Sequence, residues 1–245
     1  MAINSLTEAL LEFNKHIAPK DLFVTLVPEA QELVLSDPFA FLTASVIDRG
    51  TKAEIIWTIP YYLRLQMGHL DASKINQMTE DDLKQIFQRI PYRPRYMHDA
   101  PRTIKEMTAL VMNKFKGQAQ LLWVDQSAKS IKRTLLQIHG VGEGIANMTI
   151  LLIERAFGTH FDDMERRNLD IKPDVHTKRV LYRLGVSKDT SNSSTLEAAS
   201  QLNPSFPGEI DGPLWLIGRR FCFPSNPVCV DCPVREYCER KIDDK

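Results

Sequence analysis

The sequence predicts an all-α protein. Apolar residues recur with helical spacing along most of the chain, capping residues stand at the helix starts, and no run shows the alternation of a half-buried strand. One such segment places Ile104, Met107, Val111 and Phe115 on a single face, and Gly117 ends it. Helices packed against helices are therefore the expected architecture.

Start and stop signals divide the chain into its expected helices. Ser5 and Glu8 have the spacing of a capping box for a first helix. Asp37 and Pro38 supply the cap and the first-turn proline of a second helix, over 38–48. Thr79 opens a third, over 80–89. Further helices are expected over 128–138, 143–156, 174–184, 194–202 and 208–220, with irregular stretches at 159–173 and 186–194.

Composition and charge narrow the class of protein. The 245 residues suffice for one large domain or two compact ones, and 43% hydrophobic with 25% charged residues is ordinary for a soluble globular fold. The longest apolar run, 145–153, is too short to span a membrane, and the N-terminus lacks a signal-peptide pattern. We expect a cytoplasmic monomer, at the nucleoid in a bacterium, with no membrane partner. Because the net charge is zero, a nucleic-acid partner must be held by local patches and backbone amides.

The four cysteines are the strongest single signal. Cys222, Cys229, Cys232 and Cys238 stand close together near the C-terminus, and no cysteine precedes them. Soft thiolates this close in sequence favour a metal site over disulfides. Zinc usually takes two Cys-x-x-Cys pairs or a Cys/His mixture, whereas only one such pair is present, so the spacing favours an iron–sulfur cluster over zinc.

A glycine-bounded turn lies between two amphipathic segments. Gly140 and Gly142 flank Val141, so the backbone can turn tightly while the valine packs into the core. The next helix begins at once, and its free N–H groups can bind a phosphate oxygen. The alternative is a helix connection in which the glycines serve geometry alone. Three basic side chains on the preceding helix add charge: Lys129, Lys132 and Arg133.

Taken together, these motifs resemble the endonuclease III group of helix-hairpin-helix DNA glycosylases. Three stretches, in the family's order and spacing across 130–240, carry the resemblance: Ile138-His139-Gly140-Val141-Gly142 with Ala146-Asn147, Asp174-Val175-His176 with Arg179-Val180, and Gly218-Arg219 leading into the four-cysteine loop. The resemblance implies two helical lobes, 38–157 and 1–37 plus 158–245, flanking a DNA-binding cleft. It also implies a four-iron, four-sulfur cluster on the four cysteines that shapes a DNA-binding loop and takes no direct part in the chemistry.

The family's essential carboxylate falls on Asp174. Breaking an N-glycosidic bond builds positive charge on the sugar, and a carboxylate beside that carbon stabilises the charge and can orient water. Asp174 also follows Pro173 and precedes an apolar helix, which is the setting of an ordinary N-cap. Both roles are compatible. His176 is expected to support the local backbone.

Gly144 departs from the family in the most consequential way. Bifunctional members carry a lysine at this position, two residues after the second hairpin glycine, and it attacks the sugar. Because glycine cannot act as a nucleophile, the sequence predicts a monofunctional glycosylase that uses water. Two alternatives stay open: a non-catalytic relative that binds lesions, and a bifunctional glycosylase/AP lyase with a displaced lysine. The candidates for that lysine are Lys52, Lys172 and Lys178.

The expected partner is double-stranded DNA with a flipped-out base. Segment 91–96 corresponds to the family's wedge loop, so Tyr92 is a candidate wedge and Arg93 a candidate phosphate contact; a proline-bounded turn with a packed tyrosine is the alternative. Segment 47–52 matches the opposite wall of the cleft, so Lys52 is a candidate for DNA contact. Gly144 is another candidate. The family's glutamine is absent from segment 47–52, with Gly50 nearest its place.

The target base stays open between mismatched thymine or uracil, an alkylated purine and an unusual modified base. Adenine is disfavoured, because the adenine-removing branch adds a further C-terminal domain. Segment 159–173 is longer than the family's usual link, and it is interpreted as a solvated loop or as an edge of the base pocket. It contains the charged residues Asp162, Asp163, Glu165, Arg166 and Arg167, among others.

Overall fold

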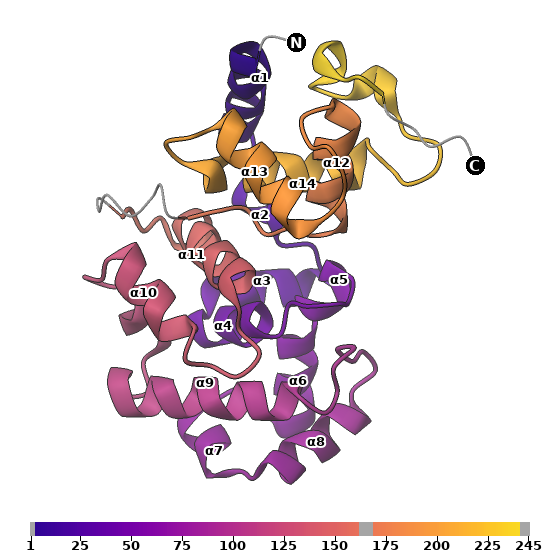
Figure 1. Cartoon of the computed structure of the whole chain (residues 1–245). Helices are drawn as coiled ribbons and strands as arrows, with labels where there is room; N and C mark the ends of the chain where they lie inside the picture. The colour runs from indigo at the N-terminus through magenta and orange to yellow at the C-terminus, as the bar shows by residue number, and fades with distance from the viewer. Residues whose placement is uncertain (1–2, 162–168, 241–245) are drawn as a thin grey trace. The chain divides into compact units, whose positions relative to one another are not determined.

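A computed structural model describes residues 3–161 and 169–240 of the chain, and every regular element in those ranges is a helix (Figure 1). The predicted all-α fold class is thus confirmed. None of the described helices is long and apolar enough to cross a membrane. The contacts divide the chain into two compact units, unit 1 from residues 1–22 with 163–245 and unit 2 from residues 23–162.

Unit 2 is built around α4 (Pro38–Val46), whose residues from Phe39 onward are all buried. The helix packs against α3, α6, α9, η1 and α11. Phe41 lies against the rings of Trp57, Trp123 and Phe157, with centroids 5.7, 6.1 and 5.2 Å away. The other helices of this unit are α3 (Pro28–Ser36), α5 (Ala53–Ile56), α6 (Ile59–Met67), α7 (Ala72–Gln77), α8 (Glu80–Arg89), α9 (Ala100–Phe115), η1 (Ala119–Leu122), α10 (Ala128–Leu135) and α11 (Glu143–Phe157).

Unit 1 joins the N-terminal helix to the C-terminal third of the chain. Helices α12 (Val175–Leu184) and α14 (Asp211–Arg220) lie side by side and pack extensively (Figure 1). Leu6 and Leu10 are fully buried in the same core, which explains why the N-terminus belongs to this unit. The remaining helices are α1 (Ile3–Lys15), α2 (Pro19–Leu22), α13 (Asn192–Leu202), η3 (Pro207–Ile210), η4 (Cys229–Asp231) and η5 (Arg235–Tyr237).

Of the three capping signals predicted in the first 90 residues, two are confirmed. Asp37 accepts hydrogen bonds from the N–H groups of Phe39 and Ala40, and Thr79 forms a reciprocal capping box with Asp82. The capping box predicted at Ser5 is wrong: α1 begins at Ile3, so Ser5 lies inside the helix. The predicted helices did not include α3, α6 or α7. α7 nevertheless carries a local cap, because the Asp71 side chain accepts a hydrogen bond from the Lys74 N–H.

Residues 23–37 belong to unit 2. The lobe boundary predicted at 37/38 assigned them to the other lobe. The physical reason is that α3 packs against α4 and α6 through Ala30, Leu33 and Val34. The other predicted boundary, 157/158, falls near the observed division after residue 162. Five of the charged residues of segment 159–173 lie at 162–167, outside the described residues.

Candidate functional site

Asp174 is the N-cap of α12. One carboxylate oxygen, Oδ1, accepts hydrogen bonds from the backbone N–H groups of His176 (2.7 Å) and Thr177 (2.9 Å). The Thr177 hydroxyl in turn accepts a hydrogen bond from the Asp174 N–H (3.0 Å), which completes a capping box. All hydrogen bonds between described residues and this carboxylate go to Oδ1. The cap therefore fixes the side chain while Oδ2 accepts no hydrogen bond from the described protein.

His176 is held by its surroundings in the first turn of α12. Its ring packs edge-on against Trp215, with centroids 6.1 Å apart, and its Nδ1 lies 3.1 Å from the Arg179 guanidinium. Burial lowers the pKa of His176, so the ring is neutral at physiological pH. A Cβ on Gly218 would lie 2.6 Å from the His176 Cβ, so α12 and α14 can approach this closely only with glycine there.

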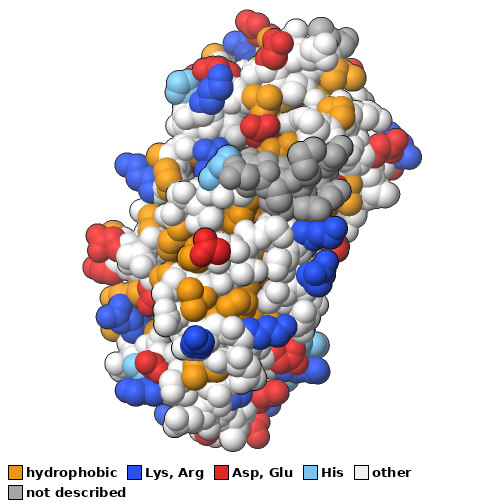
Figure 2. All heavy atoms as spheres, turned by 90° about the vertical axis from the view of Figure 1, so that its left-hand side faces the viewer, with side chains coloured by type: hydrophobic (Ala, Val, Ile, Leu, Met, Phe, Trp, Pro, Cys, Tyr) orange, Lys and Arg blue, Asp and Glu red, His pale blue; other side chains and the backbone are white. Residues whose placement is uncertain are grey.

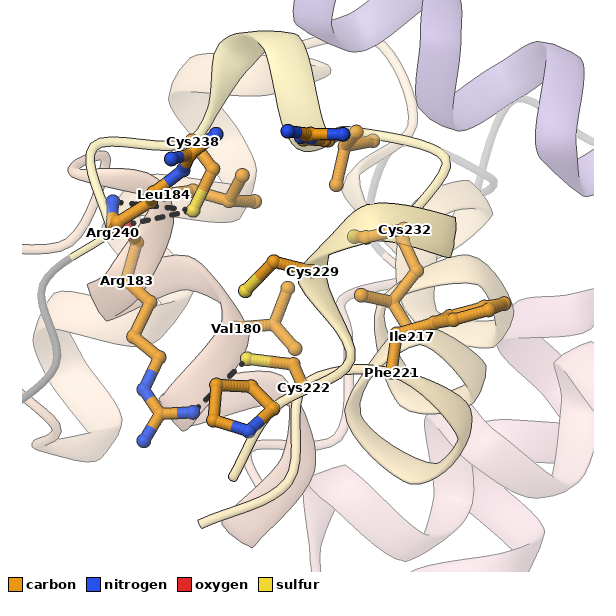
Figure 3. A pocket seen from close by; sticks show the side chains of 13 residues that line it. Val180, Arg183, Leu184, Ile217, Phe221, Cys222, Cys229, Cys232, Cys238 and Arg240 are labelled. Carbon is orange, nitrogen blue, oxygen red and sulfur yellow. Dashed lines mark hydrogen bonds between the residues drawn. The ribbon is translucent and has the colours of Figure 1, made fainter. Parts of the chain in front are cut away.

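The four cysteines line one pocket in unit 1 (Figure 3). All four are half-buried and free of disulfides. The apolar lining of the pocket includes Val180, Leu184, Ile217 and Val234. In the described part of the chain, no group of three His, Cys, Asp or Glu side chains is arranged to hold a single metal ion. The sulfurs are distributed around a pocket and do not meet at one point.

Two arginines of α12 reach this cysteine loop. Arg183 is 8% exposed, and its guanidinium donates to the carbonyl oxygens of Phe223 (2.6 Å) and Pro224 (2.8 Å) and to the Cys222 sulfur (3.4 Å). The half-buried Arg179 donates through Nε to the Cys222 carbonyl (2.6 Å). Neither arginine forms a salt bridge with a described carboxylate. Buried charge is costly without a counter-charge, so the donor set fits an anionic group bound by the cysteines.

Burial opposes the ionisation of two of the four thiols. Burial raises the pKa of both Cys232 and Cys238, so without a metal these thiols keep their protons at neutral pH. Metal ligation requires the thiolate and releases those protons. Soft sulfur ligands around one pocket and two neighbouring guanidinium groups together suit an iron–sulfur cluster.

In unit 2, α10, a short turn and α11 form a helix-hairpin-helix. Val141 is buried at its tip, as expected. Gly140 has φ +79°, which favours glycine, and a Cβ there would lie 2.5 Å from the Arg49 guanidinium and would displace it. Gly142 is the N-cap of α11 with φ −101° and open space where a Cβ would be. Neither strain nor crowding within the chain therefore explains a glycine at 142.

The charges near the hairpin are partly compensated. Lys132 of α10 pairs with Glu143 in the first turn of α11, with Nζ and Oε2 2.6 Å apart. The attraction that Lys132 would exert on a phosphate is offset by this carboxylate. Basic and acidic side chains are interspersed on the face shown in Figure 2, in keeping with the zero net charge. Gly144 lies in the same first turn of α11 and carries no side chain.

Arg49 connects the hairpin to two distant segments, and sequence reasoning missed it. Its guanidinium donates to the Gly140 carbonyl (3.3 Å), pairs with Asp99 (3.1 Å) and lies over the Tyr96 ring (5.0 Å). The His139 ring also faces Asp99, at 3.5 Å. These contacts bind segment 47–52 and the end of the 91–96 loop to the hairpin. Since Arg49 and Gly140 lie 91 residues apart, no local pattern could reveal the pair.

The loop residues suggested for DNA contact have different surroundings. Tyr92 is half-buried and packs against Tyr62, with ring centroids 5.5 Å apart, which favours the packed-tyrosine interpretation over a free wedge. Arg93 donates to the Gln88 carbonyl, and Lys52 is exposed at the N-terminus of α5. Gly50 has φ +67°, and its Cβ would lie 2.8 Å from the Tyr96 ring. A glutamine there would meet both strain and a clash.

The fold and these features define an all-helical protein with a helix-hairpin-helix and a four-cysteine loop. No family model matches the chain. It is 26% identical over 205 residues, 83% of this chain and 84% of the relative, to a Thermotoga maritima protein named endonuclease III. A putative DNA repair glycosylase of Methanocaldococcus jannaschii is 23% identical over 176 residues, 70% of this chain and 72% of that protein.

Solved structures show the same fold. An endonuclease III in a non-covalent complex with DNA superposes with a TM-score of 0.59 at 21% identity, covering 83% of this chain and 84% of that one. A thermostable thymine-DNA glycosylase superposes with a TM-score of 0.61 at 16% identity, covering 97% and 95%. The chain is thus a distant homologue of endonuclease III with an endonuclease III-like fold, which confirms the family resemblance of the sequence.

Proposed function

We propose that this protein is a monofunctional DNA glycosylase of base excision repair, which hydrolyses the N-glycosidic bond of an abnormal or mispaired base. The observation that carries the proposal is the hydrogen bonding of the Asp174 carboxylate. The relatives of the chain, a named endonuclease III and a putative DNA repair glycosylase, support it. Oδ1 is held by two backbone N–H groups, and Oδ2 accepts no hydrogen bond from the described residues. A fixed carboxylate with one uncommitted oxygen suits electrostatic stabilisation of a sugar cation.

The proposed reaction follows from the charge that develops. As the bond between base and sugar breaks, the base takes the electron pair and positive charge grows on the sugar ring. The Asp174 carboxylate stabilises this cation and accepts a proton from the attacking water, whose oxygen bonds to the anomeric carbon. Gly144 offers no amine, so water is the nucleophile. The product is an abasic site in an intact strand.

Duplex DNA is bound through the backbone of the hairpin in this proposal. Open space at Gly142 lets a phosphate approach the first N–H groups of α11, where no side chain caps the helix. Such contacts position the duplex without reading its sequence. The target base leaves the stack before cleavage, as it must for chemistry at its glycosidic bond. Mismatched thymine or uracil, alkylated purines and other modified bases are the candidate substrates.

The four cysteines are proposed to hold a four-iron, four-sulfur cluster, with Arg179 and Arg183 compensating its negative charge. The cluster would supply no step of the proposed reaction; bound by four cysteines of the loop 222–238, it would cross-link that loop to itself. Arg183 contributes to that loop directly, because its guanidinium holds the Phe223 and Pro224 carbonyls. The loop in this shape is a second candidate surface for DNA.

A panel of duplexes bearing different lesions and mismatches tests the proposal. Wild-type protein should release one class of base, identified by mass spectrometry, and leave a strand that is nicked only after alkali. Asp174→Asn should keep DNA binding and lose on the order of 100-fold or more in rate. Asp189→Asn, a change at an exposed unit 1 aspartate, should retain the wild-type rate.

Borohydride separates the proposal from its two alternatives. Wild-type protein should give no covalent adduct with DNA, whereas Gly144→Lys should give some if position 144 faces the sugar. A strong wild-type adduct would establish a displaced lysine and a bifunctional glycosylase/AP lyase. Tight lesion binding with no base released from any duplex would instead establish a non-catalytic, lesion-binding relative.

A further inference from the structure

Asp211 lies in the first turn of α14 and reaches the segment that leads to Asp174. Its Oδ1 accepts a hydrogen bond from the backbone N–H of Lys172, at 2.8 Å. Lys172 stands two residues before Asp174, and the intervening Pro173 has no N–H to donate. The Lys172 amide is therefore the last donor through which a neighbour can hold the backbone on this side of Asp174.

The carbonyl of Lys172 is held as well. It accepts a hydrogen bond from the hydroxyl of Thr177 (3.0 Å), and that hydroxyl accepts one from the Asp174 N–H (3.0 Å). Thr177 is 1% exposed, so its hydroxyl has no competing water. Both backbone groups of Lys172 are thus fixed, one by Asp211 from α14 and the other by Thr177 from α12. This arrangement sets the path of the chain into Asp174.

Keeping a carboxyl group at position 211 is costly for the fold. Burial raises the pKa of Asp211 to about 7, and the nearby Asp174 and Asp170 act in the same direction, while the Lys172 N–H and the Lys172 charge oppose them. Asp211 is half-buried, and beginning α14 does not by itself require a carboxyl that lies beside two other acids. Strongly perturbed acids of this kind gather at functional sites.

We propose that Asp211 is a positioning residue for Asp174: by holding the Lys172 amide, it fixes the backbone from which the Asp174 carboxylate is presented. The inference deepens the proposed function and rests on it. Asp211 itself need not touch DNA. Its contribution is the placement of Asp174, so the loss of Asp211 should weaken the response to a sugar cation without weakening DNA binding in general.

The test uses two duplexes that do not require the target base to be known. One carries a pyrrolidine in place of a sugar, so that a protonated nitrogen mimics the cation at the anomeric position, and the other carries a neutral tetrahydrofuran at the same site. Transition-state mimics bind more tightly where the site is complementary to the developing charge. The ratio of the two affinities thus reports the carboxylate at the sugar. Wild-type protein should prefer the cationic duplex, and Asp174→Asn should lose this preference.

Asp211→Ala should lower the ratio by roughly tenfold or more, because a small displacement of a reacting group has large effects, while affinity for the neutral duplex stays near the wild-type value. Asp211→Asn should retain most of the preference, since its amide oxygen still accepts the Lys172 N–H. Asp21→Ala is the matched control: Asp21 is also in unit 1 and also accepts a backbone N–H, that of Ala18, and its loss should leave the ratio unchanged.

The outcomes separate the two proposals. No cationic preference in wild-type protein would overturn the proposed chemistry and the inference with it. A wild-type preference that Asp211→Ala leaves intact would overturn the inference alone. Equal losses in folded Asp211→Ala and Asp211→Asn would show that the charge matters and the hydrogen bond does not, which also overturns it. If Asp211→Ala does not fold, Asp211→Glu decides, because its longer side chain should displace the Lys172 amide and lower the ratio.

Discussion

Replacing Asp211 by asparagine should change how stability depends on pH. In the folded protein burial raises the pKa of Asp211 to about 7, from an ordinary value of 3.8. Below pH 4 the carboxyl is protonated in both states and has no effect. Between pH 4 and pH 7 the unfolded chain releases the proton while the folded chain retains it, so wild-type stability falls as pH rises. Asparagine cannot titrate and escapes this loss.

The size of the effect follows from the two pKa values. Each tenfold change in proton affinity is worth about 1.4 kcal/mol, so wild-type protein loses about 4 kcal/mol from this group between pH 4 and pH 8. The free energy of unfolding of Asp211→Asn, relative to wild type, should therefore increase by about that amount over this range. Most other titrating groups are common to both proteins and cancel in the difference.

Urea unfolding followed by circular dichroism at several pH values from 4 to 8 measures this difference. Asp21→Asn is a control for which the stability difference from wild type should change with pH in the opposite direction. A hydrogen bond from Arg220 lowers the pKa of Asp21, so this group stabilises the folded chain above its unfolded pKa, and that stability is lost as pH falls through the lower, folded value. Asp21→Asn should therefore lose stability relative to wild type as pH rises. A flat difference for Asp211→Asn would refute the claim that its carboxyl is desolvated.

Two further predictions concern the cysteine loop and the hairpin. Purified protein should be brown, with iron and acid-labile sulfide near four each per chain, and Cys229→Ser should lose the cluster; zinc without iron after anaerobic purification would contradict this assignment. Gly140→Ala should weaken binding to all duplexes and lower stability, because φ is +79° and a Cβ would meet the Arg49 guanidinium. Gly142→Ala should fold normally and weaken binding if a phosphate approaches there. Unchanged affinity of both glycine variants in a binding titration would show that the hairpin is only structural.

Residues that act through near neighbours in sequence were predicted well. The caps at Asp37 and Thr79 depend on donors within three residues, and the sequence shows both partners. The Asp174 cap is of the same kind, so its N-cap interpretation needed no tertiary information. The cysteine loop and the glycine turn are likewise compact motifs. The prediction of a capping box at Ser5 was wrong because a capping pattern is only a local preference. Packing of Leu6 and Leu10 allows α1 to begin earlier.

The sequence by itself determined the helical class, the family resemblance and the chemical identities of the candidate groups, because periodicity, caps and motif spacing are local properties. Only the tertiary structure decided which distant groups meet. Arg49 reaches Gly140 across 91 residues, and Asp211 reaches Lys172 across 39. Tyr92 packs on Tyr62 for the same reason: side-chain packing in three dimensions selects partners that no local pattern specifies.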